Sequence, residues 1–566
     1  MTEADRYKIT SNDYTDILAE GYEKINNLES SSDYTVNRIN SDYAVYHLPA
    51  SKLTIDSTQT FGYAYIPKCY GLMSLSSSEA SGIVRVRNNP SLELRGQGVL
   101  IGFIDTGIDY TNPVFRYADN TTRVAAIWDQ GIESGKYPKN YYFGTEYSQW
   151  DINTALLADD PYRVVPSRDE NGHGTALAGI AAGNDGISDT FSGVAPDSEI
   201  VVVKLKEAKQ NIKDFFCIPP NVLCYQENDI MLGIQYLIDV ATQLDRPIAI
   251  CIGVGSSQGA HEGESVLCHY LNDIGKLPGK SVLAAGGNEG NTNHHYYGQI
   301  NPSTDFDVVN LNVGDKEAGF AMELWGFAPN IVTLDLYAPE GSLVARASGI
   351  FLQRSTQIVN HAGTTIYIDN QFSEERTGNQ LVMFRFLNPT PGVWRFVVSG
   401  NGDLLLRYHI WLPISNFLTA NTYFINGNKD TTLSIPANAS NTLAISTYNH
   451  QNQSLYYYSG RGFTKSGGLK PDVSSPGVNI TAPSLKGGFY NATGSSEATA
   501  HATGAIALML EWGIVKGNIT KLNNILLRRI ITNGARRFPT VTYPDQGWGF
   551  GTLDIYRAIM TYYQED

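Results

Sequence analysis

The chain has 566 residues, too many for one ordinary hydrophobic core, so its length predicts two to four domains. Apolar residues make up 42% of the sequence and charged residues 17%, which is a globular composition and excludes a disordered chain. Lys and Arg number 41 against 56 Asp and Glu, and the resulting formal charge of −15 argues against a nucleic-acid partner.

The first residues bear on the cellular location. MTEADRYKIT lacks the basic and apolar regions of a Sec-type signal peptide, and no run of about 18 apolar residues predicts a membrane-spanning helix. The chain has five irregularly spaced cysteines: Cys69, Cys217, Cys224, Cys251 and Cys268. An odd number without a zinc pattern favours free thiols in a reducing compartment. We therefore expect a cytoplasmic protein with no membrane partner, or one exported by a route not written at its N-terminus.

The N-terminal 75 residues are polar and rich in Tyr and Asn. A helix is predicted around Tyr14 to Leu28, and the alternation YAVYHL from Tyr43 to Leu48 predicts a strand. This part of the chain is therefore expected to be a small α+β unit.

From Gly98 the pattern changes to strands alternating with helices. Short apolar runs predict buried parallel strands at Val99 to Ile104, Glu199 to Leu205, Pro247 to Ile252 and Ser281 to Ala285. A helix is predicted from Asn228 to Leu244. Such alternation predicts an α/β domain with a parallel sheet.

Between residues 301 and 430 the alternation stops, and β-rich runs follow one another between turn clusters. The predicted strands are Val308–Val313, Ile331–Tyr337, Thr365–Ile368, Leu381–Phe386, Trp394–Val398 and Leu404–Leu412. This pattern indicates an inserted all-β sandwich or jelly roll. The α/β pattern then returns, with an apolar helix from His501 to about Trp512.

Three motifs carry side chains suited to nucleophilic catalysis. Asp105 follows a buried strand, His173 lies between two glycines before a helix of small residues, and Ser496 opens a further helix. Singly, an Asp or Ser in such a place is usually a helix cap. Together, Asp, His and Ser follow one of the known chain orders of the serine-protease triad.

A fourth motif, AAGGNEG, places Asn288 after another buried strand. Acyl transfer needs a hydrogen-bond donor aimed at the oxyanion that develops in the transition state, and a side-chain amide supplies one. Asn288 is therefore the candidate donor.

With these four motifs the chain resembles the subtilisin-like serine proteases, the subtilase family, over Ser81 to Ile300 and Thr431 to Ala558. The resemblance implies an endopeptidase acting on a protein or peptide substrate, with Ser496 as nucleophile, His173 as base and Asp105 as the group that orients it. It also implies an oxyanion hole of Asn288 and the Ser496 N–H. The residues Gly253, Val254 and Gly255 match the family's substrate-pairing edge.

The resemblance further implies four segments: a pro-domain at residues 1–75, the two parts of the catalytic domain at 76–300 and 431–566, and an inserted β domain at 301–430. The pro-domain of the family is an intramolecular chaperone whose C-terminus lies in the active site until it is cut. We expect self-cleavage between about Tyr70 and Ser78, with the cleaved pro-domain as a partner.

A closer resemblance is to the Csp-type germination subtilases of spore-forming clostridia. It rests on the missing signal peptide, the central β insertion, the phrase YQENDI from Tyr225 to Ile230 and the pair Ala500-His501. In that group a jelly roll clamps the protease domain, and the substrate is the precursor of a cortex-lytic hydrolase, activated by limited proteolysis. A cytoplasmic or spore-associated location follows from this resemblance.

The chain also departs from the family. Glu497 replaces a usual Met next to the nucleophile; it either favours the helix N-terminus or points into the site, where it would raise the pKa of His173. Val114 stands where secreted subtilases bind calcium through an Asp, and the oxygen-rich loop Asn184 to Asp189 is more typical of a solvated turn. The chemistry implies no cofactor. The pair His294-His295 is expected to be surface or subsite residues, not metal ligands.

Two functions of different class remain at this point. The chain is either an active, self-processing endopeptidase or a catalytically silent binding or signalling protein on the same scaffold. The complete triad favours the first. A further alternative makes the β insertion a carbohydrate-binding module, which fold alone does not decide.

Overall fold

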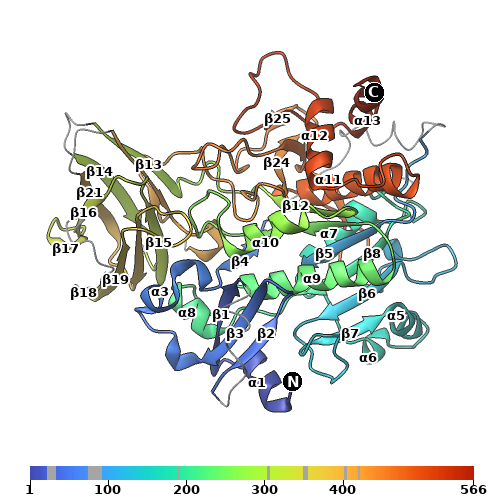
Figure 1. Ribbon diagram of the computed structural model, residues 1–566, viewed down its shortest axis with the longest axis horizontal. Helices are drawn as coiled ribbons and strands as arrows, with labels where there is room; N and C mark the ends of the chain where they lie inside the picture. The colour runs from blue at the N-terminus through green and yellow to red at the C-terminus, as the bar shows by residue number, and fades with distance from the viewer. Residues whose placement is uncertain are drawn as a thin grey trace.

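The computed structural model describes residues 1–21, 33–73, 92–187, 191–301, 306–347, 355–400, 405–418 and 421–565. A large α/β body forms the right-hand part of Figure 1, a two-sheet β unit lies at its left, and the N-terminal strands lie at its lower edge. In the sequence, the strands of the β unit lie between two strands of the large sheet of the α/β body.

The α/β body is built on a nine-stranded sheet whose central strands are parallel. Its spatial order is β25 (Ser454–Leu455), β24 (Leu443–Asn449), β12 (Lys280–Ala285), β10 (Ile248–Ile252), β5 (Leu100–Asp105), β8 (Glu199–Lys204), β6 (Val124–Asp129) and β7 (Thr145–Ser148), with β26 (Val473–Pro476) beside β24. The edge strands β7 and β25 are antiparallel to their neighbours. The four strands predicted from apolar runs are confirmed to within a residue or two.

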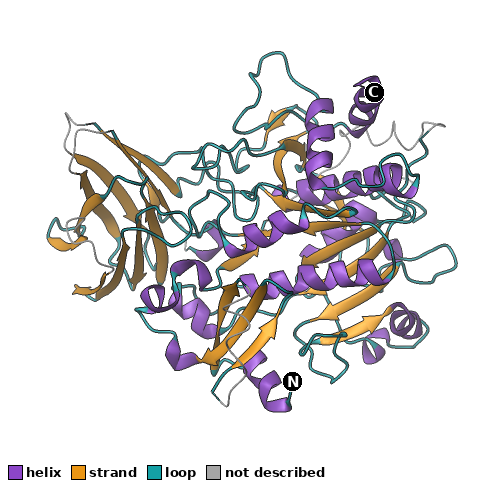
Figure 2. Ribbon diagram, in the orientation of Figure 1, coloured by secondary structure: helices purple, strands orange, loops and turns teal. Residues whose placement is uncertain are grey.

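These strands read as continuous apolar runs because helices cover both faces of the sheet (Figure 2). In β5, Ile101 and Phe103 belong to one core, and Leu100 and Ile104 belong to the other. The first face carries α7 (His173–Ala182), α11 (Ser495–Leu510), α12 (Asn524–Gly534) and α13 (Ile555–Glu565), and the second carries α9 (Glu227–Gln243) and α10 (Val266–Ile274).

Within the described residues, one helix is long and apolar enough to cross a membrane by length and composition alone. It is α11 with its π-helical continuation, Ser495–Val515, and 89% of its apolar window is buried inside the fold. Its apolar character is thus accounted for by its place in the core of the α/β body.

The β unit consists of two antiparallel sheets that share one core. The six-stranded sheet has the order β13 (His295–Ile300), β22 (Leu406–Trp411), β15 (Gly319–Trp325), β20 (Leu381–Leu387), β19 (Thr364–Gln371) and β18 (Ser355–His361). The five-stranded sheet has the order β17 (Leu343–Ala347), β16 (Val332–Tyr337), β21 (Gly392–Gly400), β14 (Phe306–Val313) and β23 (Tyr423–Phe424). All six strands predicted here are present. The first strand, β13, begins before residue 301.

The N-terminal unit contains α1 (Glu3–Thr10) and an antiparallel sheet of order β1 (Tyr14–Glu20), β3 (Tyr43–Pro49) and β2 (Thr35–Arg38). The strand predicted from Tyr43 is confirmed. The helix predicted from Tyr14 is wrong over Tyr14–Glu20, because seven residues of this segment pair with β3 and bury side chains on both faces. The remainder of that prediction lies outside the described residues.

Shorter elements complete the chain. They are α3 (Ser57–Phe61), α5 (Gln149–Leu156), α6 (Pro161–Val164), α8 (Gln210–Phe215), the 3-10 turns η1 (Ala50–Lys52), η2 (Tyr63–Tyr65), η3 (Pro113–Phe115) and η4 (Ser415–Phe417), and the hairpin β27 (Ile480–Pro483) with β28 (Phe489–Ala492). A separate three-stranded sheet, β11 (Val254–Gly255), β4 (Cys69–Leu72) and β9 (Tyr225–Gln226), lies at the site described next.

Candidate active site

The three residues predicted as a triad meet at the carboxyl edge of the central sheet. Asp105 ends β5, His173 begins α7, and Ser496 is the second residue of α11. His173 Nδ1 lies 2.6 Å from Asp105 Oδ1, and His173 Nε2 lies 3.0 Å from Ser496 Oγ. All three side chains are buried. This chain of contacts lets the imidazole accept the hydroxyl proton while the carboxylate holds the ring.

Glycine on each side of His173 makes this approach possible. Gly172 has φ +92°, a left-handed conformation that most residues avoid. A Cβ on Gly174 would lie 2.2 Å from the carbonyl oxygen of Gly107, in the loop after Asp105. Any larger residue at position 174 would push helix α7 away from β5 and separate the base from its carboxylate.

A buried carboxylate that the sequence analysis missed joins the same two loops. Asp169 Oδ1 accepts from the Thr106 hydroxyl at 2.8 Å, and its Oδ2 accepts from the Thr175 hydroxyl at 2.6 Å. Asp169 Oδ1 also accepts from the N–H groups of Asn171 and Gly172 at the start of α7. The sequence does carry a signal for this role. Asp169 lies a few residues before a helix that begins at His173, and an Asp in such a place commonly caps the helix N-terminus.

A strand of the chain's own N-terminal part occupies the cleft in front of the triad. Strand β4 is the central strand of its sheet: Leu72 and Gly71 pair with Val254 and Gly255 of β11, and Tyr70 pairs with Tyr225 of β9. The predicted pairing edge at Val254 and Gly255 is therefore where an extended peptide lies. Gly253 lies behind it, where a Cβ would come 3.1 Å from Asp105 Oδ2 and 3.3 Å from His173 Cε1.

Strand β4 places Met73, the residue after its last, in contact with Ser496. The Ser496 N–H donates to the Met73 carbonyl oxygen at 2.7 Å, and the Ser496 hydroxyl contacts the same oxygen. The Met73 side chain is 2% exposed. A carbonyl held in this way is where the reacting carbonyl of a peptide substrate would lie.

Asn288 reaches the same cleft from the loop after β12. Its Oδ1 accepts from the Ser495 N–H at 3.2 Å, and the residue lines the cleft beside His173 and Leu72. The structure brings Asn288 to the site, and its role as an oxyanion donor stays a prediction.

The charges around His173 favour its protonated form. Burial pulls the pKa of His173 down, but the Asp105 carboxylate and its hydrogen bond, with smaller contributions from Glu497 and Asp169, outweigh burial and raise it. Glu497 is fully buried, and its Oε2 lies 3.2 Å from Ser496 Oγ. Of the two sequence interpretations of Glu497, the structure supports the one in which it points into the site.

Replacing Glu497 with Gln should move the acidic limb of the pH profile to lower pH. A histidine accepts a proton only when it is neutral, so the raised pKa of His173 moves the onset of activity to higher pH. Removing the nearby negative charge of Glu497 lowers that pKa. The measurement is kcat/KM for peptide hydrolysis against pH. Glu340→Gln, at an exposed glutamate of the β unit, is the control. An acidic limb at the same pH in both variants would contradict the expectation.

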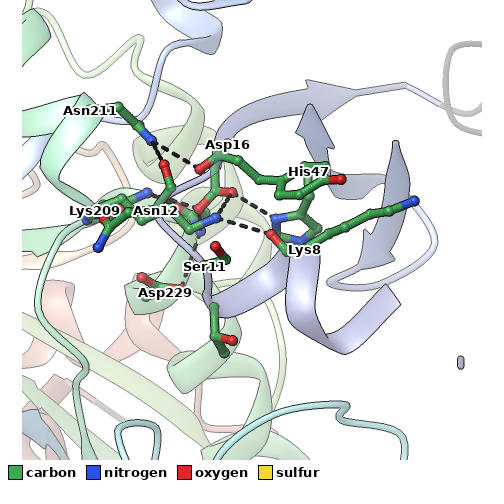
Figure 3. Close-up of polar contacts among 12 residues, drawn as sticks. Lys8, Ser11, Asn12, Asp16, His47, Lys209, Asn211 and Asp229 are labelled. Atoms are coloured by element: carbon green, nitrogen blue, oxygen red, sulfur yellow. Dashed lines mark hydrogen bonds and ion pairs between the residues drawn. The ribbon is translucent and has the colours of Figure 1, made fainter. Parts of the chain in front are cut away.

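The N-terminal unit is tied to the α/β body by a buried cluster of charges (Figure 3). Asp16 of β1 is fully buried, and its Oδ1 lies 2.7 Å from His47 Nδ1 and 2.6 Å from Lys209 Nζ. Its Oδ2 accepts from the Gln226 side-chain amide at 3.0 Å. Burial alone would raise the pKa of Asp16, but the charges of Lys209 and His47 outweigh it and hold the pKa well below its usual range.

The residues at the family's calcium position do not fit a cation. Val114 is an apolar residue 1% exposed, and Asp185 of the oxygen-rich loop is paired with Arg95 at 2.9 Å. The end of that loop, residues 188–190, lies outside the described residues. Within the ranges that the structure covers, no group of three His, Cys, Asp or Glu side chains could hold a metal ion.

The histidine pair after the Asn288 loop is more deeply placed than expected. His294 Nδ1 lies 2.7 Å from Glu289 Oε2 and is largely covered. His295 is 1% exposed and its Nε2 lies 2.8 Å from His409 Nδ1, so its assignment to the surface is wrong. The reason is that β13 pairs with β22 and turns His295 against Trp411.

A family model described as the subtilase family matches residues 96–299 and 351–551, which is more than half of the chain. Among solved structures, the Clostridium perfringens CspB protease aligns with a TM-score of 0.76 and 29% identity, over 86% of this chain and 97% of that one.

Curated relatives are similar over shorter stretches. Subtilisin from Bacillus sp. (strain TA39) is 27% identical over 224 residues, 39% of this chain and 41% of the relative. The Arabidopsis thaliana subtilisin-like protease SBT2.2 is 33% identical over 129 residues, 20% of this chain and 15% of the relative. The chain thus matches less than half the length of these curated relatives.

Proposed function

The chain belongs to the subtilase family, and from this premise we propose that it is a serine endopeptidase that cleaves peptide bonds through an acyl-enzyme on Ser496. The observation that carries the proposal is the Met73 carbonyl oxygen, which the Ser496 N–H holds at 2.7 Å while His173 Nε2 lies 3.0 Å from Ser496 Oγ. A nucleophile, its base and a substrate-like carbonyl are thereby in contact. The complete triad speaks against the catalytically silent alternative.

The first half of the reaction forms the acyl-enzyme. Ser496 Oγ attacks the carbonyl carbon while His173 Nε2 takes the hydroxyl proton, and Asp105 stabilises the imidazolium. The Ser496 N–H, with the proposed help of Asn288, stabilises the negative charge on the carbonyl oxygen. His173 then gives its proton to the leaving amine, and the C–N bond breaks.

Water completes the reaction. His173 takes a proton from the water as its oxygen attacks the acyl carbon, and the Ser496 oxygen leaves with that proton. The released product carries a carboxylate, and the enzyme returns to its starting state.

The first substrate in this proposal is the chain itself, cut between Met73 and Ser74. Support comes from β4, which lies as the central strand between β11 and β9 and delivers Met73 to Ser496. Residues 1–73 would then be the cleaved pro-domain, close to the predicted boundary at 75. The buried Asp16 cluster would hold this pro-domain on residues 74–566 after the cut.

Intact-mass measurement of the purified protein tests self-processing. We expect two chains that correspond to residues 1–73 and 74–566, with a new N-terminus at Ser74. A whole chain would contradict self-processing. A cut outside residues 70–78 would contradict the assignment of Met73 as the residue before the scissile bond.

We further propose that the two-sheet unit acts as a jelly-roll clamp on the protease domain and that the trans substrate is a germination pro-enzyme activated by limited proteolysis. Support comes from the likeness to the CspB protease over 97% of that chain and from the sequence resemblance to germination subtilases. The five cysteines are all buried without a disulfide, which favours a cytoplasmic or spore-associated location. Incubation with the precursor of a cortex-lytic hydrolase should give one defined cut; no cut by the processed enzyme would contradict this substrate.

A further inference from the structure

Between β22 and β23 the chain passes out of the two sheets of the β unit through residues 414–417, which we call the exit segment, and this segment lies over strand β4. It contains Ile414 and the turn η4, and both Ile414 and Phe417 are 2% exposed. The Asn416 side-chain amide donates to the Leu72 carbonyl oxygen at 3.1 Å. The inserted unit therefore contacts the segment that occupies the substrate cleft.

The exit segment leaves no room for a side chain at Gly71. A Cβ on Gly71 would lie 2.6 Å from Ile414 Cδ1 and 3.2 Å from Phe417 Cε1. Gly71 is itself buried, and its backbone is paired with Gly255, so the strand cannot move away without losing its pairing. Gly71 is the third residue before the proposed scissile bond.

The two side chains beside Gly71 are packed against other residues, so moving either of them disturbs its neighbours. Ile414 and Phe417 belong to a buried cluster with Cys69, Trp411 and Met73. Displacing a packed side chain forces unfavourable rotamers on its neighbours. Alanine at position 71 would therefore raise the free energy of the bound strand.

The backbone of the exit segment is hydrogen-bonded to the loop that follows β12 and carries Asn288. Glu289, the residue after Asn288, accepts from the Ser415 N–H at 2.9 Å and from the Ser415 hydroxyl at 3.0 Å. Burial would raise the pKa of Glu289, but the contact with His294 and the Ser415 donors outweigh it and lower the pKa. The carboxylate therefore stays charged and holds the segment in place beside the active site.

We propose that the exit segment is a specificity element that restricts the third residue before the cut to glycine. This inference rests on the proposed endopeptidase function and names its substrate class: extended segments with glycine at that position, as in Tyr70-Gly71-Leu72-Met73. The inserted unit thereby takes part in substrate selection through Ile414 and Phe417.

A time course of self-processing during cell-free synthesis tests the proposal without refolding. Gly71→Ala should release the 1–73 fragment at least tenfold more slowly than the wild type. Ile414→Val removes Cδ1, the nearest obstructing atom, at a small cost in packing. The double variant Gly71→Ala/Ile414→Val should recover most of the lost rate.

Ile358→Val is the matched control, because Ile358 is 54% exposed and lies in the β unit away from the cleft. It should not change processing of the wild type or of Gly71→Ala. Processing of Gly71→Ala at the wild-type rate would overturn the proposal. So would a double variant that is no faster than Gly71→Ala, provided that Ile414→Val alone is processed and therefore folded.

Failure of the proposed function would look different. In that case the wild-type chain itself would stay whole or be cut at another site. A wild type cut after Met73, together with an equally fast Gly71→Ala, would overturn only the specificity inference.

Discussion

Ser496→Ala should remain a single chain of residues 1–566 under conditions in which the wild type splits. In the proposed mechanism Ser496 supplies the oxygen that bonds to the carbonyl carbon, and its Oγ lies 3.0 Å from His173 Nε2. Loss of a triad nucleophile removes the whole chain of proton transfer and lowers turnover by about a million-fold. Intact-mass measurement of both proteins, expressed and purified identically, gives the comparison.

Ser454→Ala, at an exposed serine of the short edge strand β25, is the control and should split as the wild type does. The Ser496 variant should also keep its fold, because alanine fits the space of a serine. A Ser496→Ala protein that is still cut into two chains would mean that another protease makes the cut. If the wild type and Ser496→Ala both stay uncut, the result would instead favour the catalytically silent alternative.

Asp16→Ala should release the N-terminal unit from the rest of the protein. The substitution leaves Lys209 and His47 buried beside each other without their carboxylate. Removing one partner of a buried ion pair costs about 3–5 kcal/mol, which corresponds to an association weaker by roughly a hundred-fold to several thousand-fold. Size-exclusion chromatography of the processed protein should separate residues 1–73 from 74–566.

The control is Asp42→Ala, at an exposed aspartate of the same unit, whose side chain accepts from the Ser41 hydroxyl. This variant should co-elute with the larger chain. Where Asp16→Ala prevents processing, the same comparison is made by thermal unfolding in the Ser496→Ala background, where the chain stays whole. An Asp16 variant as stable and as tightly retained as the control would show that the cluster does not hold the two parts together.

The triad could be predicted because each of its residues lies in a short local pattern. Asp105 follows an apolar run, His173 lies between glycines, and Ser496 opens a helix of small residues. The parallel strands were predictable for a related reason, since burial on both faces leaves only apolar residues in a row. Such local patterns can be recognised without knowing which other elements the segment packs against.

Other features depend on contacts between distant parts of the chain. The segment from Tyr14 forms a strand because β3 pairs with it, from Glu20 with Tyr43 to Tyr14 with Pro49, and tertiary pairing overrides local helical periodicity. The place of Met73 depends on β9 and β11, which lie more than 150 residues further on. Glu289 and Ser415 meet only because the segment between β22 and β23 passes the loop after β12. No local sequence pattern predicts these contacts.

The position of β4 between two partner strands has a kinetic consequence. In the proposed function, the carboxyl terminus formed at Met73 would follow directly on a strand that pairs with β11 through Gly71 and Leu72 and with β9 through Cys69 and Tyr70, in the place that any other peptide must enter. The fragment would then be a competitive inhibitor present at one copy per enzyme, whatever the protein concentration. The activity available to other substrates would be governed by the residence time of the fragment and not by the rate of bond cleavage.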